Sequence, residues 1–408
     1  MQKLDPEFIR TQFPAFDVPA LKDQAFFENA GGSYTCKQVI FRMERFYRER
    51  KVQPYAPYTA SQAGGAEMDE ARRRLAEMMG VETDEVSFGP STTQNTYVLA
   101  NAVRQWLSGQ GANIIVTDQD HEANSGPWRR LADEGVEVRV WGIDPETGHL
   151  DPADLDGLID DKTRLLCFPH CSNVVAELNP VAEICAMARA ARAYTCVDGV
   201  SYAPHGVPNV GKLGADIYMF SAYKTYGPHQ GIMVVRRGIG EALPNQAHFF
   251  NGDVLYKRFT PAGPDHAQVA ASAGIADYID TLYAHLGGAD VDAEGRAEAV
   301  HDAMRQREEA LLEPLIDYLK ARNDLRLLGP RHARRAPTVA VELDRPGEDV
   351  ARELAPLGIM AGGGDFYAVR PLKAMGIDTE KGVLRLSFTH YTSEGEVTRL
   401  IKALDQVL

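Results

Sequence analysis

The sequence predicts an α/β protein with a large domain, built on a mostly parallel central sheet flanked by helices, and a smaller α+β C-terminal domain. Through the first two-thirds of the chain, short apolar runs alternate with segments rich in Ala, Arg and Glu. This pattern is typical of strands that alternate with helices in a parallel sheet. The length of 408 residues exceeds what one hydrophobic core usually serves. We therefore expect residues 20–285 to form the large domain, and residues 1–19 and 286–408 to form the small one.

The expected strands are short runs rich in β-branched, aromatic and other apolar residues. In the large domain they are Asn113–Thr117, Val136–Trp141, Thr163–Phe168, Tyr194–Asp198, Ala215–Phe220 and Gly231–Val235. Helical segments separate several of them, such as Gln94–Trp106 and Asn179–Arg192. A long helical stretch over about 274–323 is broken at Gly287-Gly288. The small domain then supplies the strands Thr338–Glu342 and Val383–Phe388, followed by an amphipathic helix over Ser393–Leu408.

The composition indicates which kinds of binding partner the protein has and in which cellular compartment it is found. The formal net charge is −14 and no stretch is basic, which argues against nucleic acid and anionic membranes as partners. No apolar run approaches the length of a membrane span, and the first residues carry no apolar signal region, so we expect a cytoplasmic protein. The five cysteines are odd in number and match no zinc spacing, which fits a reducing compartment and no bound metal. None of them lies after Cys196.

The segment from Ser221 to Gly231 places one lysine, Lys224, between two strand-like runs. Burial of a lysine in such a position lowers its pKa and makes the amine nucleophilic. The commonest use of such an amine is a Schiff base with a carbonyl group, including that of pyridoxal phosphate. Taken alone, the segment also fits a solvated lysine on a surface loop.

Two further positions follow expected strands at the edge of the sheet where ligands bind. Asp198 ends the strand Tyr194–Asp198, where a carboxylate can pair with a pyridinium nitrogen and strengthen the ring as an electron sink. His121 follows the strand Asn113–Thr117 and can stack on a cofactor ring or take part in proton transfer. Alone, Asp198 also fits a helix cap, and His121 also fits a loop histidine.

A helix start and an arginine can hold the anionic ends of a ligand. Thr92 and Thr93 belong to a Ser-Thr-Thr run at a helix start, where free N–H groups and hydroxyls suit a phosphate. A capped helix without a ligand is the other interpretation of this run. Arg385 lies inside the apolar run Val383–Phe388, so it needs an anionic partner, either an internal carboxylate or the α-carboxylate of an amino acid. Together these positions converge on one crevice, which is a stronger indication than any one of them.

With these motifs the chain resembles the class V aminotransferase family of fold-type-I pyridoxal enzymes, and most closely its cysteine desulfurase-like branch. The resemblance extends from Phe26 to the last helix and rests on Asn29-Ala-Gly, Ser91-Thr-Thr, His121-Glu-Ala-Asn, Ser172-Asn-Val, Val197-Asp-Gly and Ser221-x-x-Lys-x-x-Gly-Pro. It implies the fold-type-I architecture, pyridoxal 5'-phosphate as cofactor, and an amino acid as substrate. It also implies a homodimer with the active site near the subunit interface.

The resemblance implies a role for each residue of these motifs. Lys224 would carry the cofactor through a Schiff base, His121 would stack on its ring and serve in catalysis, and Asp198 would face its pyridine nitrogen. Asn173 and Ser201 would lie near the ring hydroxyl. The phosphate would be surrounded by Thr92, Thr93, Ser221 and Tyr223. The substrate would be held by Arg385 at its carboxylate, with Asn29, Ala30 and Phe366 beside it.

One departure from the family bears on the reaction. The desulfurases carry a catalytic cysteine on a loop shortly before the arginine, and the corresponding stretch here, Gly358–Pro371, contains no cysteine. Without a thiolate, sulfur cannot be taken up as a protein persulfide. We therefore expect a pyridoxal phosphate-dependent lyase or transferase, with a lyase-type reaction at the β-carbon as the first choice. The alternatives are an aminotransferase, epimerase or decarboxylase reaction, direct release of sulfide or selenide, and a non-catalytic protein that has kept the fold.

Overall fold

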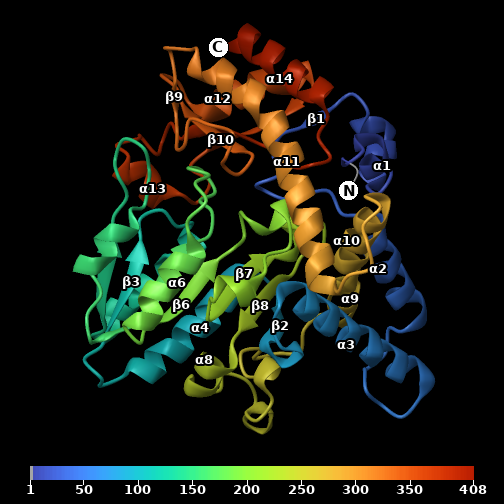
Figure 1. The fold of residues 1–408 in the computed structure, drawn as a ribbon, viewed down its shortest axis with the longest axis vertical. Coiled ribbons are helices and arrows are strands. Elements are labelled where there is room, and N and C mark those ends of the chain that lie inside the picture. The colour runs from blue at the N-terminus through green and yellow to red at the C-terminus, as the bar shows by residue number, and fades with distance from the viewer. Residues whose placement is uncertain (1–2) are drawn as a thin grey trace.

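The computed structural model describes residues 3–408 and has a seven-stranded sheet at its centre (Figure 1). The strand order is β2-β8-β7-β6-β5-β3-β4, and β8 runs antiparallel to both of its neighbours while the other pairings are parallel. In that order the strands are Val86–Gly89, Gly231–Val235, Ile217–Ser221, Tyr194–Asp198, Thr163–Pro169, Asn113–Thr117 and Glu137–Trp141. The prediction of a mostly parallel sheet is therefore confirmed.

The central sheet is buried on both faces, which explains why its strands are continuous apolar runs rather than alternating ones. Ile115, Leu166 and Val197 belong to the apolar cluster on one face, while Ile114 and Leu165 belong to the cluster on the other. The helices of this part of the chain are α2 Lys37–Glu49, α3 Thr59–Met79, α4 Thr92–Leu107, α5 Gly126–Arg129, α6 Val181–Ala190, α7 Val210–Leu213, α8 Arg237–Ala242, α9 His266–Ala271 and α10 Ala273–His285.

A second, antiparallel sheet of four strands lies above the central sheet in the view of Figure 1. Its order is β12-β13-β10-β9, and the strands are Gly362–Gly364, Val383–Ser387, Thr338–Glu342 and Arg326–Leu327. The helices packed with it are α11 Ala293–Lys320, α12 Gly347–Leu354 and α14 Glu394–Val407, while α1 Pro6–Arg10 and α13 Val369–Ala374 lie at its borders. Its apolar core is separate from those of the central sheet, as expected for a second folding unit.

The N-terminal segment crosses to the small antiparallel sheet before the chain enters the central sheet. Strand β1, Ala25–Phe26, pairs in parallel with β11, Ile359–Met360, and Glu28 forms a β-bridge with Ser387. We propose residues 20–285 as the large domain and residues 3–19 with 286–408 as the small one; residues 1 and 2, which the sequence also assigns to the small domain, lie outside the described residues. The crossing segment thus belongs to the large domain by sequence and pairs with the small one. Among residues 3–408, no helix has the length and apolar character that crossing a bilayer requires.

Candidate active site

The candidate site is a pair of adjoining cavities between the carboxyl ends of the parallel strands and the small antiparallel sheet. The outer cavity has a volume of about 590 Å³ and the inner one about 60 Å³. Both are lined by Lys224, His121, Asn173 and Tyr223. The inner cavity adds Thr92, Pro169, Cys171, Asp198, Ser201 and Ser221, and the outer one adds Glu28, Ala30, Tyr97, Glu122, Phe366, Tyr367 and Arg385. This edge of the sheet is where parallel strands bind ligands.

Lys224 ends a single 3₁₀ turn, Ala222–Lys224, that follows directly after β7. Its side chain is buried, and its carbonyl oxygen accepts a hydrogen bond of 2.6 Å from Ser33 Oγ. Burial, reinforced by the nearby Arg385 guanidinium, lowers the pKa of Lys224 to about 8. A substantial fraction of the amine is therefore neutral near physiological pH, which is the state that attacks a carbonyl.

Asp198 is buried at the end of β6, and His121 is half-buried in the loop that follows β3, and burial shifts the pKa of each toward its neutral form. Burial raises the pKa of Asp198 to about 6, although Val200 N donates a 2.8 Å hydrogen bond to its carboxylate. Burial, followed by the charges of Lys224 and Arg385, lowers the pKa of His121 to about 3. The imidazole is thus neutral, and its Nδ1 accepts a 3.0 Å hydrogen bond from Ala123 N, which leaves the ring proton on Nε2.

The start of α4 presents hydroxyls and free N–H groups to the inner cavity. Ser91 caps the helix by accepting a 3.1 Å hydrogen bond from Gln94 N, so the chain enters the helix in a fixed direction. Thr92 Oγ1 lies 2.8 Å from Ser221 Oγ, which brings the helix start against the end of β7. Thr93 and Tyr223 line both cavities beside them. A helix N-terminus with hydroxyl neighbours is well suited to an anion.

Asn173 has an unused acceptor at the same site. Its Nδ2 donates a 3.0 Å hydrogen bond to Phe366 O, while its buried Oδ1 has no hydrogen-bond partner among residues 3–408. A buried polar atom without a partner is costly unless a ligand satisfies it. The inner cavity therefore combines an amine, a buried carboxylate, hydroxyls at a helix start and an open acceptor. These groups fit the aldehyde, ring nitrogen, phosphate and ring hydroxyl of pyridoxal phosphate.

Arg385 lies on β13, and its guanidinium is nearly enclosed at the border between the two cavities and the small sheet. Its Nη2 donates a 2.6 Å hydrogen bond to Glu28 Oε1, and its Nη1 lies 3.4 Å from Asn173 O. The guanidinium carbon is 3.8 Å from the centre of the Phe366 ring. Burial lowers the pKa of Arg385, and the charge of Glu28 opposes that shift. The expectation that a buried arginine needs an anionic partner is confirmed, and that partner is Glu28.

The outer wall of the site is the segment between β12 and α13. Phe366 and Tyr367 have φ angles of 53° and 56°, a left-handed conformation that is unfavourable for residues other than glycine. Contacts with the large sheet hold them there: Glu122 N donates a 2.9 Å hydrogen bond to Tyr367 O. In addition, Arg370 pairs with the Glu122 carboxylate at 2.8 and 3.2 Å. The small sheet is thereby fastened to the loop that carries His121.

The predicted site residues fall into three groups. The residues predicted to bind the cofactor all line one or both cavities, namely Thr92, Thr93, His121, Asn173, Asp198, Ser201, Ser221, Tyr223 and Lys224. Arg385, Ala30 and Phe366, predicted to bind the substrate, line the outer cavity. The side chain of Asn29 is instead occupied by the protein: its Nδ2 donates to Phe26 O and Ser387 O, and its Oδ1 accepts from Tyr391 Oη.

Sequence reasoning assigned no role to several lining residues, three of which carry polar side chains at the outer cavity. Glu28 belongs to the N-terminal motif, Glu122 follows His121, and Tyr97 lies one helical turn beyond Thr93 on α4. The spacing of Thr93 and Tyr97 puts both on one helix face, which was the available signal for Tyr97. Nothing in the sequence predicts that Glu28 contacts Arg385.

The cysteines of the chain do not supply a thiolate to the outer cavity. All five are free and buried. Burial raises the pKa of Cys36 and of Cys171 to about 12, and that of Cys185 to about 11. Cys171 borders only the inner cavity, where it is held in the protonated form.

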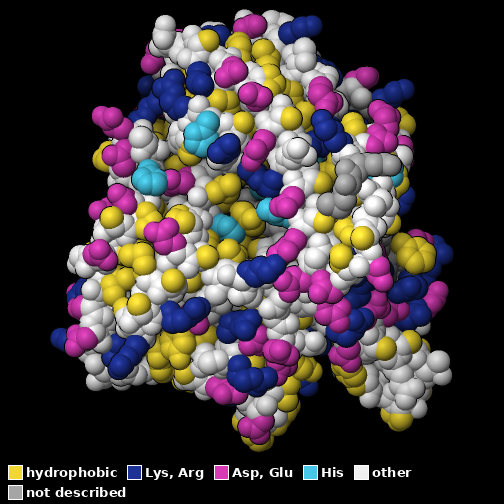
Figure 2. All heavy atoms as spheres, viewed as in Figure 1, with side chains coloured by type: hydrophobic (Ala, Val, Ile, Leu, Met, Phe, Trp, Pro, Cys, Tyr) yellow, Lys and Arg dark blue, Asp and Glu magenta, His cyan; other side chains and the backbone are white. Residues whose placement is uncertain are grey.

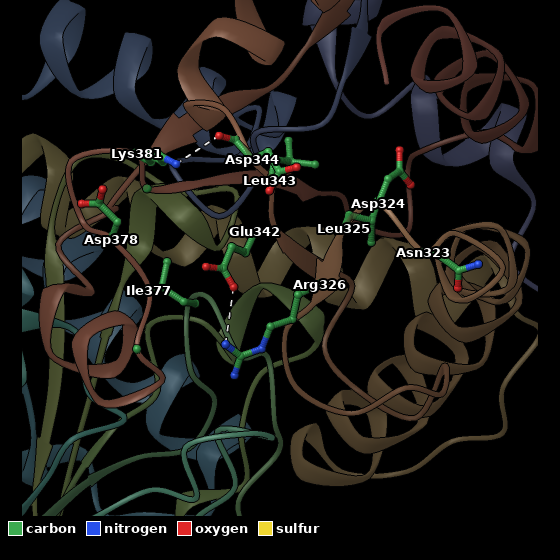
Figure 3. A pocket seen from close by; sticks show the side chains of 12 residues that line it. Asn323, Asp324, Leu325, Arg326, Glu342, Leu343, Asp344, Ile377, Asp378 and Lys381 are labelled. Carbon is green, nitrogen blue, oxygen red and sulfur yellow. Dashed lines mark hydrogen bonds and ion pairs between the residues drawn. The ribbon is translucent and has the colours of Figure 1, made fainter.

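A second hollow, of about 460 Å³, lies beside β9 and β10 and is lined by several acidic and basic side chains (Figure 3). Arg326 pairs with Glu342 at 3.4 Å, and Lys381 Nζ donates a 3.1 Å hydrogen bond to Asp344 O. Asp324 and Asp378 lie at its rim. Within the described part of the chain, no three or more His, Cys, Asp or Glu side chains are grouped as metal ligands would be. This hollow lacks the converging groups of the candidate active site.

The fold and the site define a pyridoxal phosphate-dependent enzyme, and comparison with known proteins identifies its family. The aminotransferase class-V family model matches residues 25–400, so the chain belongs to that family, whose members use pyridoxal phosphate. An aminotransferase-like protein of Gibberella zeae is 32% identical, covering 98% of each chain. A cysteine desulfurase of Pectobacterium carotovorum is 30% identical, covering 98% of this chain and 97% of its own.

Solved structures share the fold at lower sequence identity. A cysteine desulfurase from Thermococcus onnurineus superposes with a TM-score of 0.84 at 23% identity, covering 100% of this chain and 98% of its own. The cysteine desulfurase CsdA from Escherichia coli gives a TM-score of 0.81 at 23% identity, covering 100% and 99%. The predicted fold-type-I architecture is confirmed by these likenesses.

Proposed function

We propose that this chain is a pyridoxal phosphate-dependent lyase that acts at the β-carbon of an amino acid without a persulfide cysteine. The observation that carries the proposal is the composition of the two cavities. Lys224 and the buried Asp198 both line the inner cavity, while the outer cavity is lined by Arg385, Phe366 and Tyr367 and by no thiol. The cofactor set is complete, but the sulfur nucleophile of the related desulfurases has no counterpart in the sequence after Cys196.

In this proposal, the residues of the inner cavity hold the cofactor in one orientation. Lys224 would bind it covalently, Asp198 would face its ring nitrogen, and His121 would stack on its ring. Asn173 and Ser201 would lie by the ring hydroxyl, and the phosphate would be held by Thr92, Thr93, Ser221 and Tyr223. The bound cofactor supplies an electron sink for bonds at the substrate α-carbon. The ionised Asp198 carboxylate would serve as the counter-ion of a protonated ring nitrogen, which would offset the cost of burying its charge.

The proposed reaction needs a base and a carboxylate anchor in the outer cavity. Lys224 Nζ would remove and return protons at the substrate α-carbon, for which its lowered pKa of about 8 is suited. Arg385 anchors the substrate carboxylate, with Ala30 and Phe366 beside it and Asn29 supporting the backbone of that wall. Tyr367 and the Arg370–Glu122 pair limit the entry of water.

A second candidate is direct release of sulfide or selenide from cysteine or selenocysteine. The similarity to cysteine desulfurases favours it, and it requires no protein thiol. Aminotransferase, epimerase and decarboxylase reactions use the same cofactor and the same anchor, so the products must distinguish them from a lyase reaction.

The test is to incubate the holoenzyme with a panel of amino acids and identify the products. Pyruvate or alanine with a released side-chain fragment supports a lyase, and sulfide or selenide supports the second candidate. A keto acid indicates an aminotransferase, an inverted amino acid an epimerase, and an amine with carbon dioxide a decarboxylase. The absence of any product and of any change in the visible absorbance of the cofactor, with every amino acid, would overturn the proposal.

We also propose a cytoplasmic homodimer with the site near the subunit boundary. Large aromatic side chains are exposed on two projections: Phe249 is 90% and Phe250 67% exposed on one, and Tyr55 and Tyr58 are exposed on the other. Apolar side chains are visible on both projections at the lower edge of the molecule (Figure 2). A monomer rarely leaves such groups in water. Sedimentation analysis of the wild-type chain and of a Phe249→Ser/Phe250→Ser variant tests this proposal, because a dimer predicts dissociation of the variant.

A further inference from the structure

The carboxylate of Glu28 already balances the charge of Arg385 before any substrate is bound. Their contact is a single 2.6 Å hydrogen bond from Arg385 Nη2 to Glu28 Oε1, with the two side chains only 4% and 28% exposed. Glu28 Oε2 and Arg385 Nε are both buried and find no hydrogen-bond partner anywhere in residues 3–408. The pair is therefore joined at one edge only. These two atoms are enclosed by the protein, whereas the partly exposed side chain of Glu28 lines the outer cavity and presents its negative charge there.

The backbone around this pair leaves room for the long side chain of Glu28. A methyl carbon added to Gly362 would lie 2.7 Å from Glu28 Oε2, and one added to Gly31 would lie 2.9 Å from Oε1. Both distances are too short for ordinary packing, so each glycine leaves space for one oxygen of the carboxylate. Gly362 is also the residue that pairs with Arg385 across β12 and β13. The position of the Glu28 carboxylate is thus determined by the backbone as well as by the arginine.

The charges on the outer cavity determine which side chains it accepts. Lys224 also lines this cavity, but the proposed function assigns it to the cofactor, so Arg385 is left to hold an α-carboxylate. With Glu28 and that carboxylate both present, one guanidinium faces two anions. The other carboxylate of this cavity, Glu122, already has Arg370 on both of its oxygens. A second carboxylate on the substrate would add a further anion at short range in a poorly screened cavity, which is unfavourable. A hydrogen-bond donor or a cation at the same place would instead satisfy Glu28.

We propose that Glu28 is a specificity-determining residue that selects amino acids whose side chain carries a hydrogen-bond donor or a positive charge, and rejects those with a second carboxylate. This inference rests on the proposed function, since it assumes that an amino acid occupies the outer cavity. It assigns Glu28 to substrate selection and leaves Arg385 as the anchor of the α-carboxylate. Glu28 also positions Arg385, because a buried guanidinium needs a resident counter-ion when no substrate is bound.

The first experiment needs no variant. Isothermal titration of the wild-type holoenzyme with L-glutamine, L-glutamate, L-ornithine and L-norvaline compares side chains of similar length and different charge. We expect glutamine and ornithine to bind more tightly than norvaline, and norvaline more tightly than glutamate. Glutamine should exceed glutamate by about tenfold or more in affinity, the scale of one unscreened charge contact at several ångströms. Equal affinities for glutamine and glutamate would overturn the proposal.

The second experiment uses three variants, each checked for folding by circular dichroism. Glu28→Gln should bring the glutamine-to-glutamate affinity ratio close to one, mainly because glutamate binds better. Glu28→Asp keeps the negative charge and should keep the preference. Glu342→Gln is the control, because it removes a carboxylate that lines the separate hollow and neither of the two cavities, and it should leave all four affinities unchanged.

The outcomes separate this inference from the function on which it rests. An unchanged affinity ratio in Glu28→Gln, in a protein that still binds the cofactor, overturns the role of Glu28 and leaves the proposed function intact. A wild-type protein that never acquires the visible absorbance of a lysine-bound cofactor overturns the proposed function, and the selection by Glu28 falls with it.

Discussion

The two walls of the candidate site are built on different principles. At the carboxyl ends of the parallel strands, Lys224 and Asp198 are buried with their charges only loosely compensated, and the pKa of each is shifted toward neutrality, to about 8 and about 6. On the small antiparallel sheet, Arg385 is equally buried but is paired with Glu28 at 2.6 Å. The charges of Lys224 and Asp198 on the first wall are not fully compensated, so a bound cofactor is expected to stabilise them. On the second wall the charge of Arg385 is already compensated by Glu28, and we propose that this carboxylate discriminates between ligands.

Replacing the lysine of the first wall gives the largest expected effect. Lys224→Ala should abolish the visible absorbance of the lysine-bound cofactor and lower amino-acid turnover by about 10⁴-fold, since the base at the α-carbon is lost. Absorbance spectra and steady-state rates measure both effects. Lys381→Ala, at the hollow on the small domain, is the control and should leave both unchanged. Turnover that survives in Lys224→Ala would show that the first wall has been wrongly assigned.

The ion pair of the second wall is tested most directly by replacing Arg385, which is its cation. Arg385→Met should lower the free energy of unfolding by about 3 kcal/mol or more, because the Glu28 carboxylate is left buried without a partner. The double variant Glu28→Gln/Arg385→Met should recover most of that loss, and urea unfolding of the wild type, both single variants and the double variant measures the coupling. Losses of unfolding free energy that are additive in the double variant would contradict the view that Glu28 and Arg385 stabilise each other.

The first wall should show the opposite response when its carboxylate is neutralised. Because the pKa of Asp198 is raised from 3.8 to about 6, the folded protein without cofactor holds this proton more tightly than the unfolded chain. The associated stability is fully present below about pH 4 and is lost as the pH rises through about 6.

Asp198→Asn should therefore stabilise the cofactor-free protein at pH 7, by about 2–3 kcal/mol, while lowering turnover by about 100-fold. Unfolding of the wild type and of the variant between pH 4 and pH 7 checks the sign, and the asparagine retains an oxygen for the Val200 N–H. A variant that is less stable than the wild type at pH 7 would mean that the Asp198 carboxylate is already compensated.

The contact between the two walls gives the smallest expected effect. Arg370→Gln breaks a half-exposed ion pair with Glu122 and should change the free energy of unfolding by less than about 1 kcal/mol. It should raise KM more than it lowers kcat, because the Phe366–Tyr367 segment is fastened less firmly. Arg352→Gln breaks a comparable exposed pair on α12 and should leave KM unchanged. Equal effects of the two variants on KM would show that the Glu122 contact does not order the outer wall.

Sequence reasoning succeeded for the first wall because that wall depends on local patterns. The expected strands Asn113–Thr117, Tyr194–Asp198 and Gly231–Val235 have the bounds of β3, β6 and β8. Strands of a parallel sheet end at one edge, so the residues that follow them had to meet. Lys224 and Asp198 were therefore predictable as neighbours, although their pKa shifts depend on the depth of burial.

The second wall could not be predicted to the same extent, because it depends on the register of distant segments. Nothing in the chain near Glu28 indicates that β1 pairs with β11, or that Gly362 leaves space for a carboxylate. The left-handed conformation of Phe366 and Tyr367 also runs against local preference, since glycine is the residue expected there. Their conformation is imposed by tertiary contacts, which a single sequence does not reveal.

Because the N-terminal segment pairs with the small sheet, it determines the order in which parts of the protein can fold during synthesis. Glu28 and Arg385 are 357 positions apart, and Arg10 of α1 pairs with Glu396 of α14 across 386 positions. The strands of the central sheet are all synthesised by Val235, whereas β11, the partner of β1, follows only at Ile359–Met360. We therefore expect a nascent chain to form the central sheet and the inner cavity first. Glu28 can pair with Arg385, the contact on which the proposed selectivity depends, only after β13 has been synthesised.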